Sequence, residues 1–466
     1  MNTHESDMQI KEILSLINLK KFKEADLKLS IFAKNHSSID VIENIKGLIS
    51  LKKEDYKISI NFFKKAIEIN SQYLNAYINL ASAYGNLKSF DESIKCLEKA
   101  LIINPNLDTI HNNLSYVFSK INKTEKSIYH SKKAKDLNPH NPNNYFNLGN
   151  IFFQIHKYEN AIVEYRNTIE INKNFNEVFF QLAESYKKIK NYEDALFNYK
   201  IAQQENTSWL RKEKIIAKIL ECYLILDKKD DYIKEINFLS MNNSNNRRIA
   251  ATSSFIANQF KIKNDYPFCP QPLNFIFHTS LQKYFENFTE YLTALFTEIT
   301  SEKFRWEPSG KTTRNGYGTV GNLSEKKLPF VSKLEDCIKK ELITYFELYK
   351  NENIKFIKNW PLKFKIVSWS NRLKTEGYNI SHIHPGGWVS GVFYLQIPNN
   401  VKNNEGGIEF SLHGDDYYII HKDIPNKTIN PDIGDLVLFP SSLFHRTIPF
   451  NSNEERVCIA FDLCGV

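Results

Sequence analysis

The sequence is poor in cysteine and has no long apolar run. Its 466 residues include only six cysteines, and no two of them form a CxxC pair. We therefore expect neither a disulfide framework nor a zinc ribbon, and a reducing cytoplasm is the predicted location. No stretch approaches the 18 uninterrupted apolar residues of a membrane-spanning helix. The first residues, MNTHESDMQIKEILSLINLKK, contain acids where a secretory signal peptide needs basic residues.

The sequence also lacks a strong excess of charge of one sign. Its 61 Lys and Arg residues against 53 Asp and Glu residues give a net charge of +8. The lysines are scattered among acids and asparagines, which predicts a solvated surface and no nucleic-acid or membrane partner. The chain is 42% hydrophobic, with 33 Phe and 24 Tyr, and this is enough for packed cores. Its length suits two or three domains.

A period of 34 residues runs through the amino-terminal half. Four independent columns of similar residues keep this step: Ala66, Ala100, Ala134, Thr168 and Ala202; Asn70, Asn104, Asn138, Asn172 and Asn206; Leu80, Leu114, Leu148 and Leu182; and Tyr84, Phe118, Phe152 and Tyr186. A fixed period of this length indicates a repeat architecture, in which stacked units share one continuous core.

The period and its pattern of small and large residues resemble the tetratricopeptide repeat. The small residues at positions 81, 115, 149 and 183 would let paired helices approach, and Pro105 and Pro139 would follow the second helices. The resemblance implies an all-α solenoid over 1–239, with its best repeats at 74–209 and degenerate ends. A helix pair is expected over 209–239. A solenoid offers a concave groove, which could bind a protein or peptide, pack against the rest of the chain, or mediate self-association. The oligomeric state is not predicted.

The texture changes after the repeats. We expect a linker over 240–272, because SMNNSNNRR is polar and KNDYPFCPQP has three prolines in six residues. Helical stretches follow at 279–301 and 328–350. From Phe364 onward, short alternating runs, among them WVSGVFYLQI, YYIIH (417–421) and DLVLFP, predict an all-β barrel or sandwich within a domain at 273–466.

Five of the 12 histidines gather in this β-rich region, between residues 382 and 445. Side chains alternate along a strand, so His382 and His384 of SHIHPGG are expected to point the same way. A third histidine from a later strand, His445, would complete a facial metal triad. Arg456 follows and opens the last apolar run, RVCIAFDL.

This order of motifs resembles the iron(II)- and 2-oxoglutarate-dependent oxygenases, over about 315–466 and most specifically over 381–398 and 434–463. The resemblance implies a double-stranded β-helix (jelly roll) with flanking helices, and hence a multidomain α + β chain. It also implies an Fe(II) cofactor and 2-oxoglutarate as cosubstrate. His382 matches the first metal ligand and His445 the distal ligand. Arg456 and Tyr394 match residues that bind the far carboxylate of 2-oxoglutarate, and no catalytic residue beyond the metal ligands is implied.

The chain departs from most of these oxygenases at His384, where they have Asp or Glu. His384 could be a third metal ligand, or the metal could be held by two histidines and water. A three-His cupin dioxygenase that does not use 2-oxoglutarate, and a repeat scaffold without catalysis, therefore stay open as alternatives. Arg456 favours the 2-oxoglutarate reaction, because a dicarboxylate cosubstrate needs a buried guanidinium there.

Other residues of this region are weaker candidates for the site. His413 and His421 fall outside the motif positions and are expected to be surface or loop residues. The segment SGKTTRNGYGTVGN lacks the phosphate-loop spacing and is expected to be an ordered loop or strand edge near the site. Trp388 and Phe444 adjoin the predicted ligands and are candidates for the substrate side. The substrate would be a peptide, a protein or a small molecule.

Overall fold

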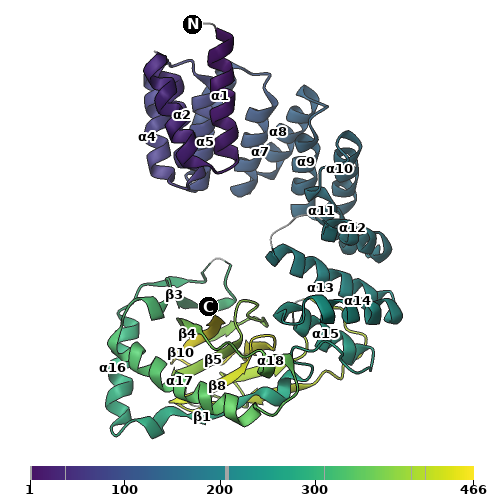
Figure 1. Cartoon of the computed structure of the whole chain (residues 1–466), viewed down its shortest axis with the longest axis vertical. Coiled ribbons are helices and arrows are strands. Elements are labelled where there is room, and N and C mark those ends of the chain that lie inside the picture. The colour runs from purple at the N-terminus through teal and green to yellow at the C-terminus, as the bar shows by residue number, and fades with distance from the viewer. Residues whose placement is uncertain (1–2, 37, 205–208, 309, 400, 415) are drawn as a thin grey trace. The chain divides into compact units, whose positions relative to one another are not determined.

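The protein is described by a computed structural model that covers residues 3–36, 38–204, 209–308, 310–399, 401–414 and 416–466 (Figure 1). The chain forms two compact units, Met1–Asn191 and Tyr192–Val466. In the part of the chain that the structure describes, no helix is both long and apolar enough to cross a membrane.

The first unit is an array of consecutive helices joined by short turns. They are α1 (Thr3–Asn18), α2 (Phe22–Asn35), α3 (Ile39–Lys52), α4 (Tyr56–Ile69), α5 (Leu74–Asn86), α6 (Phe90–Ile103), α7 (Asp108–Lys120), α8 (Thr124–Leu137), α9 (Pro142–Gln154), α10 (Tyr158–Ile171) and α11 (Glu177–Lys188). The expected all-α tetratricopeptide solenoid is confirmed.

The residues that face each other inside a helix pair explain why small side chains recur. Gly149 of α9 faces Tyr165 of α10, and a Cβ atom at Gly149 would lie 2.6 Å from the tyrosine ring. Gly47 faces Phe63 in the same way, whereas the repeat whose facing residue is leucine carries Ala81. A larger ring on the second helix therefore goes with a smaller residue on the first, as close packing at constant volume requires.

The turn inside each pair carries the same period in its backbone. One residue at each 34-residue step has a positive φ, between 57° and 66°: Lys20, Glu54, Lys88, Asn122, His156 and Lys190. A single left-handed residue commonly ends a helix, because it allows the chain to satisfy the last carbonyl groups. The regular backbone extends to Lys20, so the weakly matching first repeat has the geometry of the others.

The second unit begins with helices and continues into the β-rich region. Its helices are α12 (Tyr192–Gln204), α13 (Trp209–Ile225), α14 (Lys229–Asn242), α15 (Arg247–Gln259), α16 (Phe288–Thr300), α17 (Pro329–Tyr349) and α18 (Lys355–Lys358). Helices α13 and α14 form the expected pair, and α16 and α17 flank the sheets (Figure 1).

The stretch expected to be a linker, 240–272, contains helix α15. Its small residues pack closely: Ala250, Ala251, Ser253 and Ser254 are all buried. The side chain of Asn246 accepts a hydrogen bond from the Ile249 N–H (3.0 Å) and caps the helix. The polar residues before α15 thus supply the start of a helix inside the predicted linker.

The strands form two antiparallel sheets. They are β1 (Phe277–Ser280), β2 (Phe304–Trp306), β3 (Thr313–Thr319), β4 (Phe364–Asn379), β5 (Val389–Gln396), β6 (Ile408–Ser411), β7 (Asn426–Ile429), β8 (Asp435–Pro440), β9 (Phe444–Thr447) and β10 (Arg456–Gly465). The seven-stranded sheet has the order β1-β8-β5-β10-β4-β3-β2 and the three-stranded sheet the order β7-β6-β9. This arrangement is consistent with the expected jelly roll.

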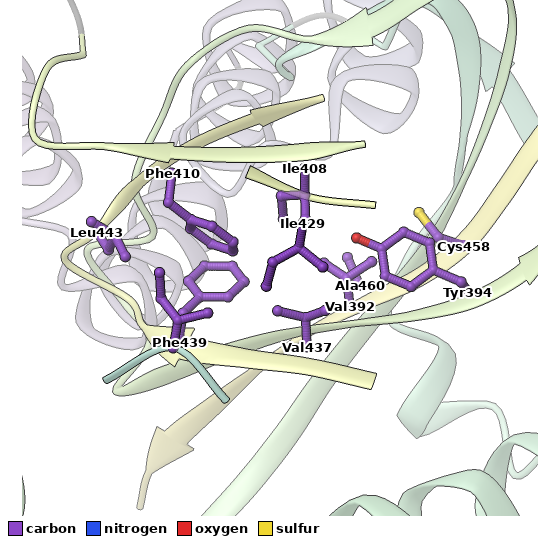
Figure 2. Close-up of a cluster of buried hydrophobic side chains, with 11 residues drawn as sticks. Val392, Tyr394, Ile408, Phe410, Ile429, Val437, Phe439, Leu443, Cys458 and Ala460 are labelled. Carbon is purple, nitrogen blue, oxygen red and sulfur yellow. The ribbon is translucent and has the colours of Figure 1, made fainter. Parts of the chain in front are cut away.

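The core lies between the two sheets (Figure 2). Val392, Val437 and Phe439 come from the larger sheet, and they meet Ile408 and Phe410 of the smaller one. All five positions belong to the alternating runs that predict the strands, because inward residues recur at every second position.

The prediction of a strand at 417–421 is wrong. This segment is a loop held by α15: the Gln259 side-chain oxygen accepts hydrogen bonds from the N–H groups of Ile420 and His421, both at 2.8 Å. The Tyr417 hydroxyl bonds to the Thr252 hydroxyl at 2.8 Å. A helix side chain thus satisfies backbone groups that a neighbouring strand would otherwise pair with.

Candidate metal centre

A regular strand was expected at His382 and His384, but both residues lie in the connection between β4 and β5. His382 forms an isolated antiparallel bridge with His445 of β9, with N–H to O=C distances of 3.1 Å in both directions. The His384 N–H bonds to the Ser441 carbonyl at 2.9 Å. The two imidazoles share one side because this connection is extended and paired at both histidines.

The three predicted histidines converge. Each offers a ring nitrogen, and these nitrogens all lie within 4.8 Å of one another. The ring centroids of His382 and His445 are 4.3 Å apart, and that of His384 is 5.0 Å from each. No metal ion is part of the structure, but a set of imidazole nitrogens this close together suits a divalent transition metal.

The tautomers of these histidines leave the same nitrogen free in each. The Nδ1–H of His382 donates to the Ile380 carbonyl (2.7 Å), and that of His445 donates to the Leu443 carbonyl (3.1 Å). His384 Nδ1 lies 2.6 Å from a carboxylate oxygen of Asp462, which can only accept. A neutral imidazole that donates through Nδ1 has its lone pair on Nε2. All three Nε2 atoms are therefore available to a metal.

Burial keeps two of the three histidines uncharged. Desolvation, with the neighbouring His384 second, lowers the pKa of His382 to about 3. Desolvation and the two other histidines hold the pKa of His445 well below its usual value. Neutral imidazole is the form that binds a metal, so His382 and His445 are in their binding form at neutral pH.

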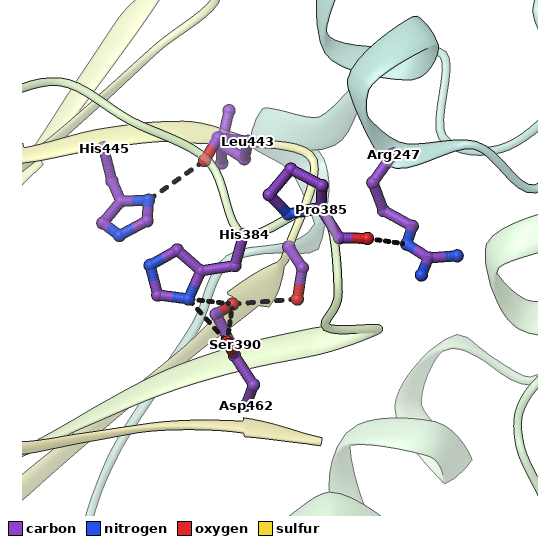
Figure 3. A network of polar contacts seen from close by, with 8 residues as sticks. Arg247, His384, Pro385, Ser390, Leu443, His445 and Asp462 are labelled. Atoms are coloured by element: carbon purple, nitrogen blue, oxygen red, sulfur yellow. Dashed lines mark hydrogen bonds and ion pairs between the residues drawn. The ribbon is translucent and has the colours of Figure 1, made fainter. Parts of the chain in front are cut away.

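A polar network not predicted from the sequence surrounds His384 (Figure 3). Asp462 of β10 accepts hydrogen bonds from His384 Nδ1 (2.6 Å) and from the Ser390 hydroxyl (2.6 Å). The Ser390 and Ser441 hydroxyls lie 2.8 Å apart. The sequence does hold a signal for Asp462: it is the single acid of the buried run RVCIAFDL, on the same face as Arg456 at steps of two.

Helix α15 supports the loop that carries His384. The Arg247 Nε–H donates to the Pro385 carbonyl at 3.0 Å (Figure 3). The Arg247 guanidinium also lies 5.6 Å from the Trp388 ring centroid. The Trp388 indole N–H in turn donates to the Phe356 carbonyl at 2.9 Å. These contacts fix the residues directly after the HxH motif, which would otherwise be an unsupported turn.

A cavity of about 560 Å³ contains the three histidines and Arg456. It is lined on its apolar side by Val392, Ile408 and Phe439, and on its polar side by residues of β3 and β4. Arg456 is only 2% exposed, and its Nε–H donates to the Gly406 carbonyl at 2.7 Å. Among the described residues, no carboxylate lies within ion-pairing distance of this guanidinium. A buried arginine without an acid partner is a site for an anionic ligand.

Tyr394 lies behind Arg456, with the guanidinium 4.9 Å from the ring centroid. The tyrosine is fully buried and does not line the cavity. Burial raises its pKa, and the phenol stays protonated. An arginine without an acid partner, backed by this ring, fits the carboxylate group that the resemblance implies.

The remaining candidates are placed as follows. His413 bonds to the Tyr417 carbonyl (3.1 Å) and is outside the histidine cluster, as is His421. Trp388 and Phe444 do not line the cavity, so the expectation that they face the substrate is wrong. Both are buried in the packing that supports the site. Lys311 does line the cavity, 5.9 Å from the Trp369 ring, in the loop before β3 where an ordered loop was expected.

Residues 367–462, which include the three histidines, Arg456 and Asp462, match the family model described as "Putative 2OG-Fe(II) oxygenase". Residues 44–73, 74–107 and 142–175 match tetratricopeptide-repeat models. The chain thus carries tetratricopeptide repeats and a C-terminal domain that matches the "Putative 2OG-Fe(II) oxygenase" model. This family implies Fe(II) and 2-oxoglutarate, and the three-histidine cluster of the oxygenase domain fits a metal.

Solved structures similar to this chain include pilF of Pseudomonas aeruginosa (17% identity, 44% of this chain and 92% of that one, TM-score 0.39). Others are a chain of the APC/C hetero-tetramer Cut9–Hcn1 (16%, 48% and 44%, TM-score 0.42) and TTC0263, a tetratricopeptide-repeat protein of Thermus thermophilus (16%, 39% and 99%, TM-score 0.35). No curated protein matches the chain in sequence.

Proposed function

We propose that the oxygenase domain is an iron(II)- and 2-oxoglutarate-dependent hydroxylase, with His382, His384 and His445 as the metal ligands. The observation that carries the proposal is the joint geometry of the cavity: one ring nitrogen from each of the three histidines lies within 4.8 Å of the others, and a buried guanidinium without an acid partner lines the same space. Bound together, Fe(II) and 2-oxoglutarate supply activated dioxygen for hydroxylation of a C–H bond, with succinate and carbon dioxide as the other products.

The protein's own residues bind and orient. His382, His384 and His445 would hold the metal through one ring nitrogen each and would leave its other positions for the cosubstrate and dioxygen. Arg456, with Tyr394 packed behind its guanidinium, would hold the far carboxylate of 2-oxoglutarate, which fixes the cosubstrate at both ends. Arg456 is 2% exposed and shares the cavity with the apolar side chains of Val392, Ile408 and Phe439, so its charge is weakly screened. A reducing cytoplasm, the location we propose, would keep the metal ferrous.

We propose that the substrate is a peptide, a protein or a small molecule. We also propose that the repeats bind either this substrate or a partner protein in their concave groove. The functional division that we propose is a repeat domain at 1–239, a connecting segment at 240–272 and the oxygenase domain at 273–466. Helix α15 belongs to the connecting segment by sequence, yet it supports the HxH loop through Arg247.

The rival function is a three-His dioxygenase that does not use 2-oxoglutarate. The specific observation in its favour is His384, where most related oxygenases have a carboxylate. Buried Arg456 favours the 2-oxoglutarate reaction, because a metal site that binds no dicarboxylate gives no reason to keep a guanidinium without an acid partner in the cavity.

Uncoupled turnover separates the two functions. The full chain, loaded with Fe(II) in the presence of ascorbate, is expected to convert 2-oxoglutarate to succinate slowly without added substrate. His445→Ala should abolish this, because it removes a metal ligand. Oxygen consumption that proceeds equally with and without 2-oxoglutarate would support the three-His dioxygenase instead.

A further inference from the structure

His384 differs from the other two cluster histidines in what holds its Nδ1–H. Backbone carbonyls hold His382 and His445, whereas a carboxylate, that of Asp462, holds His384. We infer that Asp462 is a positioning residue: it fixes the tautomer and orientation of His384 and places beside the metal site the negative charge that the HxH motif lacks. This inference rests on the proposed metal site, and it assigns a role to a residue outside the ligand set.

The carboxylate is itself held in place. Its Oδ1 accepts from His384 Nδ1 and from the Ser390 hydroxyl, both at 2.6 Å, and Ser390 lies directly opposite Asp462 in the β5–β10 pairing. Side chains that are mostly buried, 12% exposed for His384 and 15% for Asp462, make this a low-dielectric pair. The imidazole therefore cannot rotate without breaking a charge-assisted hydrogen bond.

The loop is shaped to admit this carboxylate. Gly387, three residues after His384, faces the pair: a Cβ atom there would lie 3.0 Å from Asp462 Cγ and 2.6 Å from the Ser441 hydroxyl. Any larger residue would displace the carboxylate from His384. The glycine and the two serines thus serve one arrangement, in which Asp462 reaches His384 from behind.

Geometry separates Asp462 from the ligands. The set of groups that could share one metal contains only the three histidines in the described chain, and Asp462 is not in it. Its Oδ1 is already occupied by two donors. A carboxylate on the far nitrogen of a metal-binding imidazole raises the basicity of that ligand, and removing such a partner typically weakens metal binding about 10- to 100-fold.

The test measures metal affinity on the full chain, with Co(II) and Zn(II) as probes under anaerobic conditions. We expect Asp462→Ala to bind both metals about 10- to 100-fold more weakly than wild type. Asp462→Asn keeps an oxygen that can accept from Nδ1–H, so its loss should be smaller, at the lower end of this range. The matched control is Asp435→Ala, which removes the carboxylate of a His–Asp pair of similar length (His278, 2.7 Å) outside the cavity. Its metal affinity should equal that of wild type.

Two results would overturn the inference. Equal affinity in wild type, Asp462→Ala and Asp462→Asn would show that the carboxylate has no part in the site. A complete loss of binding in Asp462→Ala, as deep as in His445→Ala, would make Asp462 a ligand and not a positioning residue. Circular dichroism melting of each variant identifies losses due to unfolding, and Ser390→Ala, which leaves the carboxylate in place, then serves as a milder perturbation with an expected loss of a few-fold.

A second readout does not depend on the metal. In metal-free protein with ¹⁵N-labelled histidine, His384 should show a strongly deshielded Nδ1–H proton that moves upfield in Asp462→Asn and is lost in Asp462→Ala. If wild type shows this proton but binds no metal, the proposed function fails while the His384–Asp462 pair stands. If metal binds and the proton is absent, the positioning role fails alone.

Discussion

Replacing Arg456 by alanine should weaken 2-oxoglutarate binding strongly and leave metal binding nearly unchanged. The guanidinium has five N–H donors. One of them is used by the Gly406 carbonyl, and Nη1 makes a weak contact with the Cys458 sulfur at 3.6 Å. The remaining donors can form a planar, two-bond contact with a carboxylate in a cavity that excludes water on one side.

The expected size follows from this burial. Truncating one partner of a buried, hydrogen-bonded charge pair costs about 2–5 kcal/mol, and each 1.4 kcal/mol is a factor of ten. Arg456→Ala should therefore lower 2-oxoglutarate affinity by at least tenfold and by as much as about a thousandfold. Arg456→Lys keeps the charge but not the fork and should fall between wild type and alanine.

The assay is isothermal titration of 2-oxoglutarate into Co(II)-loaded protein without oxygen. Arg372→Ala is the matched control: Arg372 is on β4, pairs with Glu455 at 2.7 Å and does not line the cavity. It should bind 2-oxoglutarate as wild type does. His445→Ala should lose both the metal and 2-oxoglutarate. Normal 2-oxoglutarate affinity in Arg456→Ala would refute the reasoning and favour the three-His dioxygenase.

Three further predictions concern the packing of the repeats, the titration of His130 and the Tyr394 hydroxyl. Gly149→Ala should destabilise the repeats by about 1–3 kcal/mol, because its methyl group would meet the Tyr165 ring. Gly85→Ala, whose nearest neighbour is 3.9 Å away, should leave the free energy of unfolding unchanged. Equal melting curves for the two variants would contradict the packing account. Burial lowers the pKa of His130 from 6.5 to about 4. As the pH falls, the unfolded state therefore takes up the proton first, and the free energy of unfolding of the repeats should decrease between pH 6.5 and 4. His130→Gln should flatten this decrease in urea melts, and an unchanged slope would assign the decrease to other groups. Tyr394→Phe removes a hydroxyl beside the Arg456 guanidinium and should weaken 2-oxoglutarate binding several-fold through that arginine; unchanged affinity would restrict Tyr394 to packing.

The sequence predicts those parts of this protein that depend on a local period. The 34-residue columns locate the helix pairs, because every repeat places the same small and large residues in contact. The alternating runs locate β4, β5, β8 and β10, whose inward faces meet in one core. The HxH motif, His445 and Arg456 are found as candidate site residues because each stands in a distinctive order within those runs.

What the sequence does not reveal depends on contacts between distant segments. Residues 417–421 alternate like a strand, yet Gln259 of α15 pairs with their backbone. Trp388 adjoins the predicted metal ligands in sequence, but its indole N–H bonds to the Phe356 carbonyl outside the cavity. Asp462 escapes notice because an acid near the end of a strand is ordinarily a solvent-facing residue; only the folded sheet brings it to His384.

The most direct test of the account is an anaerobic Fe(II) titration of the full chain with and without 2-oxoglutarate, followed by visible absorption. Chelation of Fe(II) by a 2-oxo acid gives a weak charge-transfer band. We expect this band only when protein, Fe(II) and 2-oxoglutarate are all present, with one iron per chain at saturation, and we expect His445→Ala to abolish it. Iron binding without any band in wild type, at 2-oxoglutarate concentrations that saturate related sites, would contradict the claim that the three histidines and Arg456 form one site for iron and 2-oxoglutarate.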